Sequence, residues 1–108
     1  MPVYKVLRPS EWDALRARGE TPGSPLDVLD GFVHLSAAPQ VAETLRLHFA
    51  QEPGLVLLAL DDAALALRWE PSRGGEPFPH HYGPLRVADI LWTAPLPLEG
   101  GRHLLPPL

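Results

Sequence analysis

The stretch LVLLAL, residues Leu55–Leu60, decides the fold of this 108-residue chain, because it is the longest uninterrupted apolar run in the sequence. Six apolar residues in a row are typical of a strand that is buried on both faces of a sheet. Pro53-Gly54 forms a turn before the run, and Asp61-Asp62 ends it and provides a cap for one helical turn. We therefore expect a central strand at residues 55–60.

Upstream of this strand, the pattern predicts strands that alternate with two helices. A weakly alternating segment at Val3–Leu7 predicts the first strand. The first helix is expected to begin with Ser10 as its N-cap, to use Asp13 in a shortened capping box and to end at Gly19. Residues 20–30 hold two prolines and one glycine, which predicts a loop.

A short strand is expected at Gly31–Ser36, and a second helix follows it. Pro39 suits the first position of that helix. Val41, Leu45 and Phe49 recur at i, i+4 and i+8, so they form one apolar stripe that faces the core.

Downstream, strands are expected at 66–70 and 90–96, with a hairpin turn at 99–101. Residues 71–84 contain four prolines and three glycines and are expected to form a long loop. The resulting order, β-α-β-α-β-β-β, lacks regular βαβ alternation. It therefore favours the α+β class, as a single domain over residues 1–108.

Composition excludes several classes of function. The net charge of −4 does not favour DNA or an anionic membrane surface as a partner. The absence of cysteine excludes disulfides, thiolate catalysis and cysteine-based zinc sites. No apolar run is long enough to span a bilayer, and residues 1–5 do not resemble a signal peptide, so we expect a cytoplasmic location.

Phe32, His34 and Ser36 share one face of the expected strand 31–36, while Val33 and Leu35 share the other. An aromatic ring, an imidazole and a hydroxyl that face the same way can line a ligand pocket. The alternative is a half-buried histidine with a purely structural role. On this triplet alone the structural alternative is the more common one.

Arg68 and Glu70 share a strand face in the same way. They form either a surface ion pair or an anion-binding arginine beside a catalytic carboxylate. The loop that follows offers a cation beside flexible backbone at Arg73-Gly74, and then four aromatic or imidazole side chains. These four are Phe78, His80, His81 and Tyr82. A long loop of this composition is either functional or a rigid surface loop packed by its own aromatic rings.

Two further kinds of site find little support. His34, His80 and His81, with Glu70, are residue types that bind catalytic zinc, but no HxH or HxxxH spacing is present, so we predict no metal. A serine–histidine hydrolase is not favoured either, since His34 and Ser36 lie on a strand with no nucleophile elbow.

Three segments, Asp30–Ser36, Leu67–Pro71 and Phe78–Leu85, resemble the family called domain of unknown function 952. Its pattern reads DGFIHLS, then RWEPSRGG, then FPHLYGPL, and this sequence differs in having Val33 and His81 where isoleucine and leucine are usual. The resemblance covers essentially the whole chain. It implies a fold similar to the ADP-ribosyltransferase group, with a small split β-sheet core, flanking helices and a cleft for NAD.

The resemblance also implies roles for individual residues. His34 with Ser36 matches the early-strand histidine that contacts a ribose, Tyr82 matches the ring that stacks on nicotinamide, and Glu70 matches the catalytic acid. In the toxin-like branch, however, the glutamate follows the tyrosine, whereas Glu70 precedes Tyr82. A related group, the RNA 2′-phosphotransferases, relies on histidines and arginines instead. The catalytic candidates are therefore His34, Glu70 and His80, and the ligand-binding candidates are Phe32, Ser36, Arg68, Arg73, Gly74, His81 and Tyr82.

Two functions from different classes remain open. The first is an enzyme, or a former enzyme, of the transferase or 2′-phosphotransferase type, which takes NAD or an ADP-ribose-like nucleotide as substrate or ligand. The second is a non-catalytic module that binds a small anion or a peptide in the same pocket. Neither function implies a certain cofactor beyond NAD as a substrate or ligand, and both are compatible with a monomer or a homodimer. For both, we expect the three segments to converge on one cleft.

Overall fold

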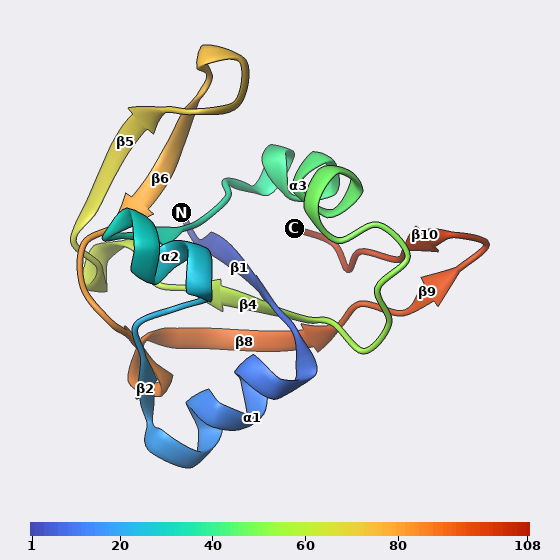
Figure 1. Cartoon of the computed structure of the whole chain (residues 1–108), viewed down its shortest axis with the longest axis horizontal. Helices are drawn as coiled ribbons and strands as arrows, with labels where there is room; N and C mark the ends of the chain where they lie inside the picture. The colour runs from blue at the N-terminus through green and yellow to red at the C-terminus, as the bar shows by residue number, and fades with distance from the viewer.

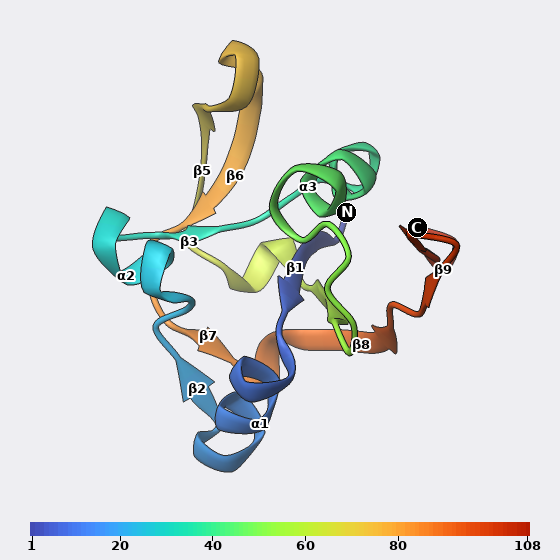
Figure 2. The ribbon, with the colours of Figure 1, turned by 45° about the vertical axis from the view of Figure 1, so that its right-hand side comes forward.

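The computed structural model describes all 108 residues and confirms the α+β class. The chain forms two three-stranded antiparallel sheets. Figures 1 and 2 show that one sheet lies at the centre and the other projects from it, with helices around them. The central sheet has the order β1-β4-β8 and consists of β1 (Val3–Leu7), β4 (Val56–Leu60) and β8 (Ile90–Pro95). The projecting sheet has the order β3-β6-β5 and consists of β3 (Val33–His34), β6 (Pro77–His81) and β5 (Leu67–Pro71).

The remaining elements are short. Two small two-stranded sheets pair β2 (Glu20–Thr21) with β7 (Leu85–Arg86), and β9 (Leu98–Glu99) with β10 (Arg102–His103). The α-helices are α1 (Pro9–Arg18), α2 (Pro25–Asp30) and α3 (Val41–His48). The 3-10 turns are η1 (Ala38–Gln40), η2 (Asp62–Ala64), η3 (Arg73–Gly75) and η4 (Val87–Asp89). None of the helices has the length and apolar character needed to cross a lipid bilayer.

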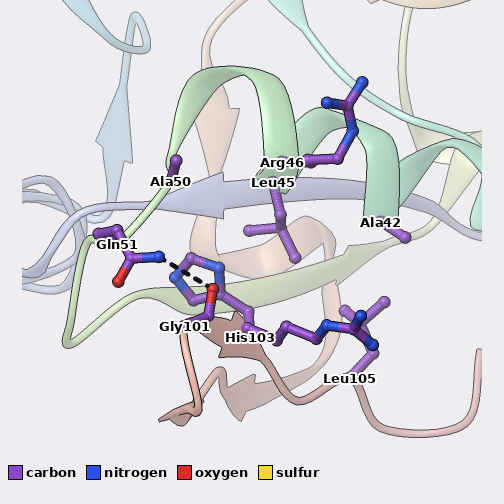
Figure 3. A pocket seen from close by; sticks show the side chains of 9 residues that line it. Ala42, Leu45, Arg46, Ala50, Gln51, Gly101, His103 and Leu105 are labelled. Atoms are coloured by element: carbon purple, nitrogen blue, oxygen red, sulfur yellow. Dashed lines mark hydrogen bonds between the residues drawn. The ribbon is translucent and has the colours of Figure 1, made fainter.

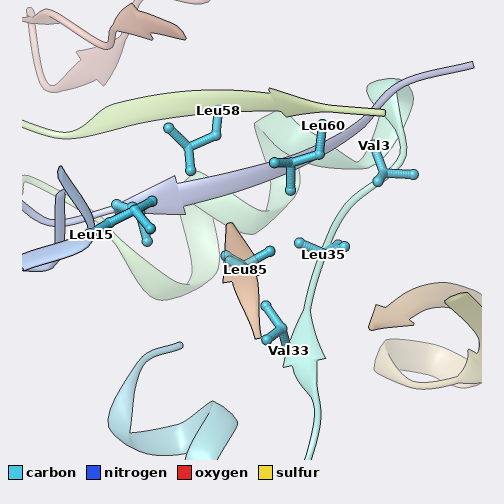
Figure 4. Packing of buried hydrophobic residues seen from close by; sticks show 8 residues of the cluster. Val3, Leu15, Val33, Leu35, Leu58, Leu60 and Leu85 are labelled. Carbon is cyan, nitrogen blue, oxygen red and sulfur yellow. The ribbon is translucent and has the colours of Figure 1, made fainter. Parts of the chain in front are cut away.

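The central strand predicted from the apolar run is confirmed. β4 lies between β1 and β8, and alternate side chains enter two separate cores. Leu58 and Leu60 face a cluster that contains Val33 and Leu35, as Figure 4 shows. Val33 and Leu35 are 1% and 3% exposed, so their predicted burial is also confirmed.

The second core lies on the other face of the same sheet. Leu57 and Ala59 pack there against Val41 and Leu45 of α3, and Phe49 lies at the edge of this cluster. The apolar stripe predicted for the second helix is therefore confirmed. Because each face of β4 contacts a different layer, burial of one strand holds both layers of the molecule together.

The first helix starts two residues earlier than the sequence predicts. Arg8 is its N-cap, Pro9 takes the first helical position, and the Glu11 carboxylate accepts a hydrogen bond from the Arg8 amide at 2.8 Å. The assignment of Ser10 as N-cap and Asp13 as its partner was wrong, because proline fits the first turn, where no amide donor is needed. Gly19 ends the helix with φ of 80°, as predicted.

The loop predicted at residues 20–30 is also wrong, since this segment contains β2 and α2. The missed signal is a capping box. The Ser24 hydroxyl accepts a hydrogen bond from the Asp27 amide at 3.2 Å, and the Asp27 carboxylate accepts one from the Ser24 amide at 2.8 Å. Pro25, one of the two prolines on which the predicted loop depended, occupies the first helical turn instead.

The long loop predicted at residues 71–84 is wrong as well. Its second half is β6, which forms a hairpin with β5 through the turn η3. Prolines are usually absent from the middle of a sheet because they cannot donate to the ladder. Here Pro79 still contributes its carbonyl oxygen, which accepts a hydrogen bond from the Leu35 amide at 3.0 Å.

The two large sheets meet at residues 33–36. Val33 and His34 pair with β6, and two residues later Ser36 pairs with Tyr4 of β1. The backbone of Ser36 donates to Tyr4 and accepts from it, at 2.9 and 2.8 Å. One short segment therefore belongs to both sheets, and the side chains along it lie at the junction between them.

Candidate functional site

The three strands of the projecting sheet place His34, Arg68 and His80 on one face. The register pairs His34 with His80 and Arg68 with His80, so these three residues form one cross-strand row. Phe32 lies next to this row, with its ring centroid 4.6 Å from that of His34. The structure thus brings together segments that are about 45 residues apart in the sequence.

Glu70 is the hydrogen-bonding centre of this face. Its Oε1 accepts a hydrogen bond from the Tyr82 hydroxyl at 2.7 Å and lies 2.8 Å from His80 Nδ1. The Tyr82 hydroxyl, and then His80, lower the pKa of Glu70, and the same carboxylate raises the pKa of Tyr82. Glu70 is therefore an ionised acceptor at neutral pH rather than a proton donor.

His80 is buried, with 4% of its surface exposed. The Phe32 ring stacks on its imidazole, with centroids 4.1 Å apart and planes inclined by 21°. Nδ1 of His80 is within hydrogen-bond distance of Glu70. Nε2, in contrast, is the one buried side-chain polar atom of the molecule with no hydrogen-bond partner. An oriented imidazole with an unused nitrogen is a candidate acceptor or donor for a ligand.

His34 is held between two carboxylates of α2. Its Nδ1 lies 2.6 Å from Asp27 and its Nε2 lies 2.9 Å from Asp30. Lys5 Nζ donates to the other oxygen of Asp27 at 2.8 Å and to the carbonyl oxygen of His34 at 3.1 Å. Both ring nitrogens of His34 are thus engaged within the protein.

Asp27 is a site residue that the sequence analysis missed. Burial disfavours its charged form, but the hydrogen bonds from His34 and Lys5 and the positive charge of Lys5 outweigh burial and hold the pKa of Asp27 far below its usual value. The sequence does contain a signal for Asp27: it lies three residues after Ser24, which forms a capping box with it, and seven residues before His34. Because residues 20–30 were predicted as a loop, this capping box was not recognised.

A groove runs along the junction of the two sheets. Its wider part has a volume of about 280 Å³ and its narrower part about 90 Å³, and the two share His34, Ser36, Thr44 and His48. α3 forms one wall, and Arg73 and Phe78 of the hairpin form the wall of the narrower part. The Arg73 guanidinium lies over the Phe78 ring at 4.6 Å.

Ser36 lies at the floor of this groove. Its hydroxyl is 3.0 Å from that of Thr44, which in turn donates to the Gln40 carbonyl oxygen at 3.0 Å. These contacts fix α3 against the strand segment. Ser36 is therefore 6% exposed and contributes mainly to the shape of the groove.

Other candidates lie away from the groove. His81 is on the opposite face of the sheet, where Nδ1 accepts from the Ala66 amide at 3.1 Å and Nε2 donates to the Pro84 carbonyl oxygen at 3.0 Å. Gly74 lies at the exposed tip of the hairpin, with φ of 64°. Arg68 stacks on the Tyr82 ring at 5.1 Å, on the same sheet face as His80 but outside the residues that line the groove.

No group of three or more histidine, cysteine or acidic side chains is arranged to hold a metal ion. His34 and Asp27 are close together, but Lys5 brings a positive charge to the same carboxylate. The metal content of the purified protein therefore stays a prediction, to be checked by elemental analysis.

Comparison with known proteins places the chain among relatives of unknown function. The model of the family described as "Protein of unknown function (DUF952)" matches residues 6–93. The crystal structure of protein CC0527 from Caulobacter crescentus is 44% identical, with a TM-score of 0.91 over 96% of this chain and 94% of that one. Its solution structure is 43% identical, with a TM-score of 0.83 over 94% and 90% of the two chains. No curated protein matches the chain.

Proposed function

We propose that this chain, which belongs to the DUF952 family of proteins of unknown function, binds an anionic nucleotide of the NAD or ADP-ribose type in the groove at the sheet junction. The observation that carries this proposal is Arg73. It lies in the wall of the narrower part, its guanidinium rests on Phe78, and it forms no ion pair with an acidic side chain of the protein. Its charge is therefore available to a phosphate, which arginine binds in a bidentate manner.

The charge balance of the groove supports an anionic ligand. Asp27, the buried acid of the wider part, is already compensated by Lys5 and His34. Glu11 accepts the hydrogen bond of the Arg8 amide at the start of α1, and so is part of a helix cap. His48 lines both parts of the groove and adds a second basic group beside Arg73.

The wider part suits the less polar portion of such a ligand. Its lining includes Tyr4, Val6 and Phe49, which provide aromatic and aliphatic surface within reach of the polar floor at His34 and Ser36. Small-molecule sites are typically concave and apolar, with a few polar groups that fix the orientation of the ligand. The resemblance to the ADP-ribosyltransferase group, in which NAD binds between two sheet halves, motivates the choice of nucleotide.

Calorimetric titration with NAD, ADP-ribose and AMP, at one fixed salt concentration, tests the proposal. Loss of a charge-assisted hydrogen bond costs about 1.5–3 kcal/mol, so Arg73→Ala should weaken binding by about ten- to a hundredfold. Arg16→Ala is the matched control, because Arg16 lies on the exposed side of α1 and pairs with Asp13. No binding of any adenine nucleotide at millimolar concentration would reject the proposal.

One observation favours binding of the nucleotide without turnover over the function of a transferase that acts on it. The candidate catalytic groups are occupied by each other and by their neighbours: Glu70 by Tyr82 and His80, and His34 by two aspartates. A transferase of the glutamate-dependent type requires that carboxylate to face the substrate. Mass spectrometry of the nucleotide after several hours with the protein separates the two functions, since only an enzyme alters it chemically.

A further inference from the structure

The largest cavity of the molecule is separate from the proposed nucleotide groove. It has a volume of about 480 Å³ and lies between α3 and the C-terminal hairpin of β9 and β10, as Figure 3 shows. It shares no lining residue with the groove. Its size falls within the range of small-molecule sites, about 300–1,000 Å³.

The charged groups around this cavity are all basic. Arg46 and Arg102 line it, together with His103, and no aspartate or glutamate does. Arg102 is exposed and makes no ion pair or hydrogen bond through its side chain, whereas Arg46 is paired with Glu43 one turn earlier in α3. Arg102 is therefore the cation available to an anionic group in the cavity.

The apolar part of the lining consists of Ala42, Leu45, Ala50 and Leu105, four of the nine lining residues. Leu45 is 3% exposed and points from α3 toward His103 and Leu105 on the opposite side (Figure 3). Ala42 and Ala50 flank it on the helix side, and their small side chains leave the cavity open. A ligand that fills this space needs an aliphatic or aromatic body as well as a negative charge.

The rim of the cavity is fixed by the loop after α3. Gln51 has φ of 63° and is the only residue other than glycine with a left-handed backbone, and its side chain donates to the Gly101 carbonyl oxygen at 3.1 Å. His103 Nε2 donates to the Glu52 carbonyl oxygen at 2.7 Å. A left-handed backbone at a residue with a side chain persists only where the surroundings enforce it, and such positions concentrate at ligand sites.

We propose that this cavity binds a small amphipathic monocarboxylate. The carboxylate pairs with the Arg102 guanidinium, and the apolar body lies against Leu45 and Leu105. Phosphate or sulfate alone does not fill the site, because neither ion covers the apolar surface of Ala42, Leu45, Ala50 and Leu105. The two binding sites are independent, so this site does not require the nucleotide proposal to hold.

NMR titration of the ¹⁵N-labelled protein with hexanoate tests the proposal. We expect saturable shifts at the amides of Ala42, Ala50 and Gly101. Hexan-1-ol and hexylamine have the same tail without the negative charge and should bind at least tenfold more weakly. Inorganic phosphate has the charge without the tail and should leave these amides unshifted.

Variants locate the site. Arg102→Gln should weaken hexanoate at least fivefold, and Ala42→Leu should weaken it by filling the cavity from the helix side. Both residues are exposed, so both variants are expected to fold, and circular dichroism verifies this. Arg16→Gln and Arg73→Ala, which lie outside the cavity, should leave the affinity unchanged.

The proposal is overturned if hexanoate gives no saturable shift, if hexan-1-ol binds as tightly as hexanoate, or if Arg102→Gln binds like the unchanged protein. It is also overturned if phosphate shifts the same amides as strongly as hexanoate does. The nucleotide proposal is rejected by different results: no binding of adenine nucleotides, or no effect of Arg73→Ala on their affinity.

Discussion

Four hydrogen bonds converge on the buried carboxylate of Asp27. Two come from the amide and the imidazole of His34, one from the Ser24 amide and one from the Lys5 ammonium. A single side chain thus caps α2, compensates a buried lysine and orients the histidine at the floor of the groove. Removing its charge leaves the buried Lys5 ammonium without an opposite charge, and an uncompensated buried charge is among the costliest defects in a protein.

We predict that Asp27→Asn lowers the free energy of unfolding by about 3–5 kcal/mol at pH 7. Because the pKa of Asp27 is lower in the folded protein than in the unfolded chain, the unfolded state binds more protons as the pH falls. The stabilisation is therefore complete above the unfolded pKa of about 4 and is lost as the pH falls toward the folded value. Urea unfolding between pH 7 and pH 2.5 measures this, and the gap between the two proteins should narrow in acid.

Asp13→Asn is the control for this experiment. Asp13 forms an exposed pair with Arg16, and such pairs contribute about 0–1 kcal/mol. Its variant should follow the unchanged protein across the whole pH range. If Asp27→Asn showed the same pH dependence as the unchanged protein, the network around Asp27 would not be what stabilises this part of the fold.

At the scale of elements, the predictions from sequence were correct where a single hydrophobic pattern decided the structure of a segment. The central strand and the stripe of α3 depend on burial, and both patterns are plain in the sequence. Residues 20–30 and 71–84 were predicted as loops because of their prolines. In the structure Pro25 starts a helix and Pro79 lies within β6, since in each place the missing amide donor is tolerated.

The turn before α2 depends on Gly23. Its φ is 104°, and an added Cβ would overlap the Asp27 carboxylate and lie 2.6 Å from the Asp27 Cβ. Gly19, at the end of α1, also has a left-handed φ of 80°, but no atom lies within 4 Å of the position of its Cβ. Alanine variants of these two glycines therefore distinguish the energetic cost of a left-handed backbone from the energetic cost of a steric clash.

We predict that Gly19→Ala destabilises the protein by about 1 kcal/mol, the cost of a left-handed alanine, and that Gly23→Ala costs at least about 2 kcal/mol more. The additional cost arises because the new methyl group displaces the carboxylate that binds Lys5 and His34. Thermal and urea unfolding of the two variants give the comparison. Equal losses of stability would show that Asp27 moves away without consequence.

At the scale of the molecule, the site depends on how two sheets are joined, and this is what the sequence revealed least. Strand alternation placed Phe32, His34 and Ser36 on one face, but the pairing of His34 with His80 and of Ser36 with Tyr4 depends on long-range register. The pattern within one strand fixes which side chains share a face, but it does not show which distant strand is the partner. His81 could not be separated from His80 because residues 71–84 were predicted as a loop, and in a loop neighbouring side chains have no fixed alternation; within β6 the two side chains face opposite sides of the sheet.

The β5–β6 hairpin projects from the rest of the fold (Figures 1 and 2), and its outer half is tied back chiefly by Gln40. The Gln40 side chain is buried and donates to the Glu76 carboxylate and to the Pro77 carbonyl oxygen, both at 2.9 Å. β4 is enclosed on both faces, whereas Arg68 and Trp69 of β5 are exposed. Segments with few buried contacts open at a lower free energy than the core does.

We predict that the amides of residues 72–76 exchange with deuterium through an opening of the hairpin alone, well before those of β4. Gln40→Ala removes both hydrogen bonds to the hairpin, so its amides should exchange about tenfold faster, which corresponds to about 1.4 kcal/mol. Gln51→Ala releases the other hairpin, at Gly101, and should leave residues 72–76 unchanged. Since the hairpin carries Arg73, its opening also changes the width of the groove. Equal protection of residues 72–76 and β4 would instead mean that hairpin and core unfold as one unit, and the groove would then be a fixed feature of the fold.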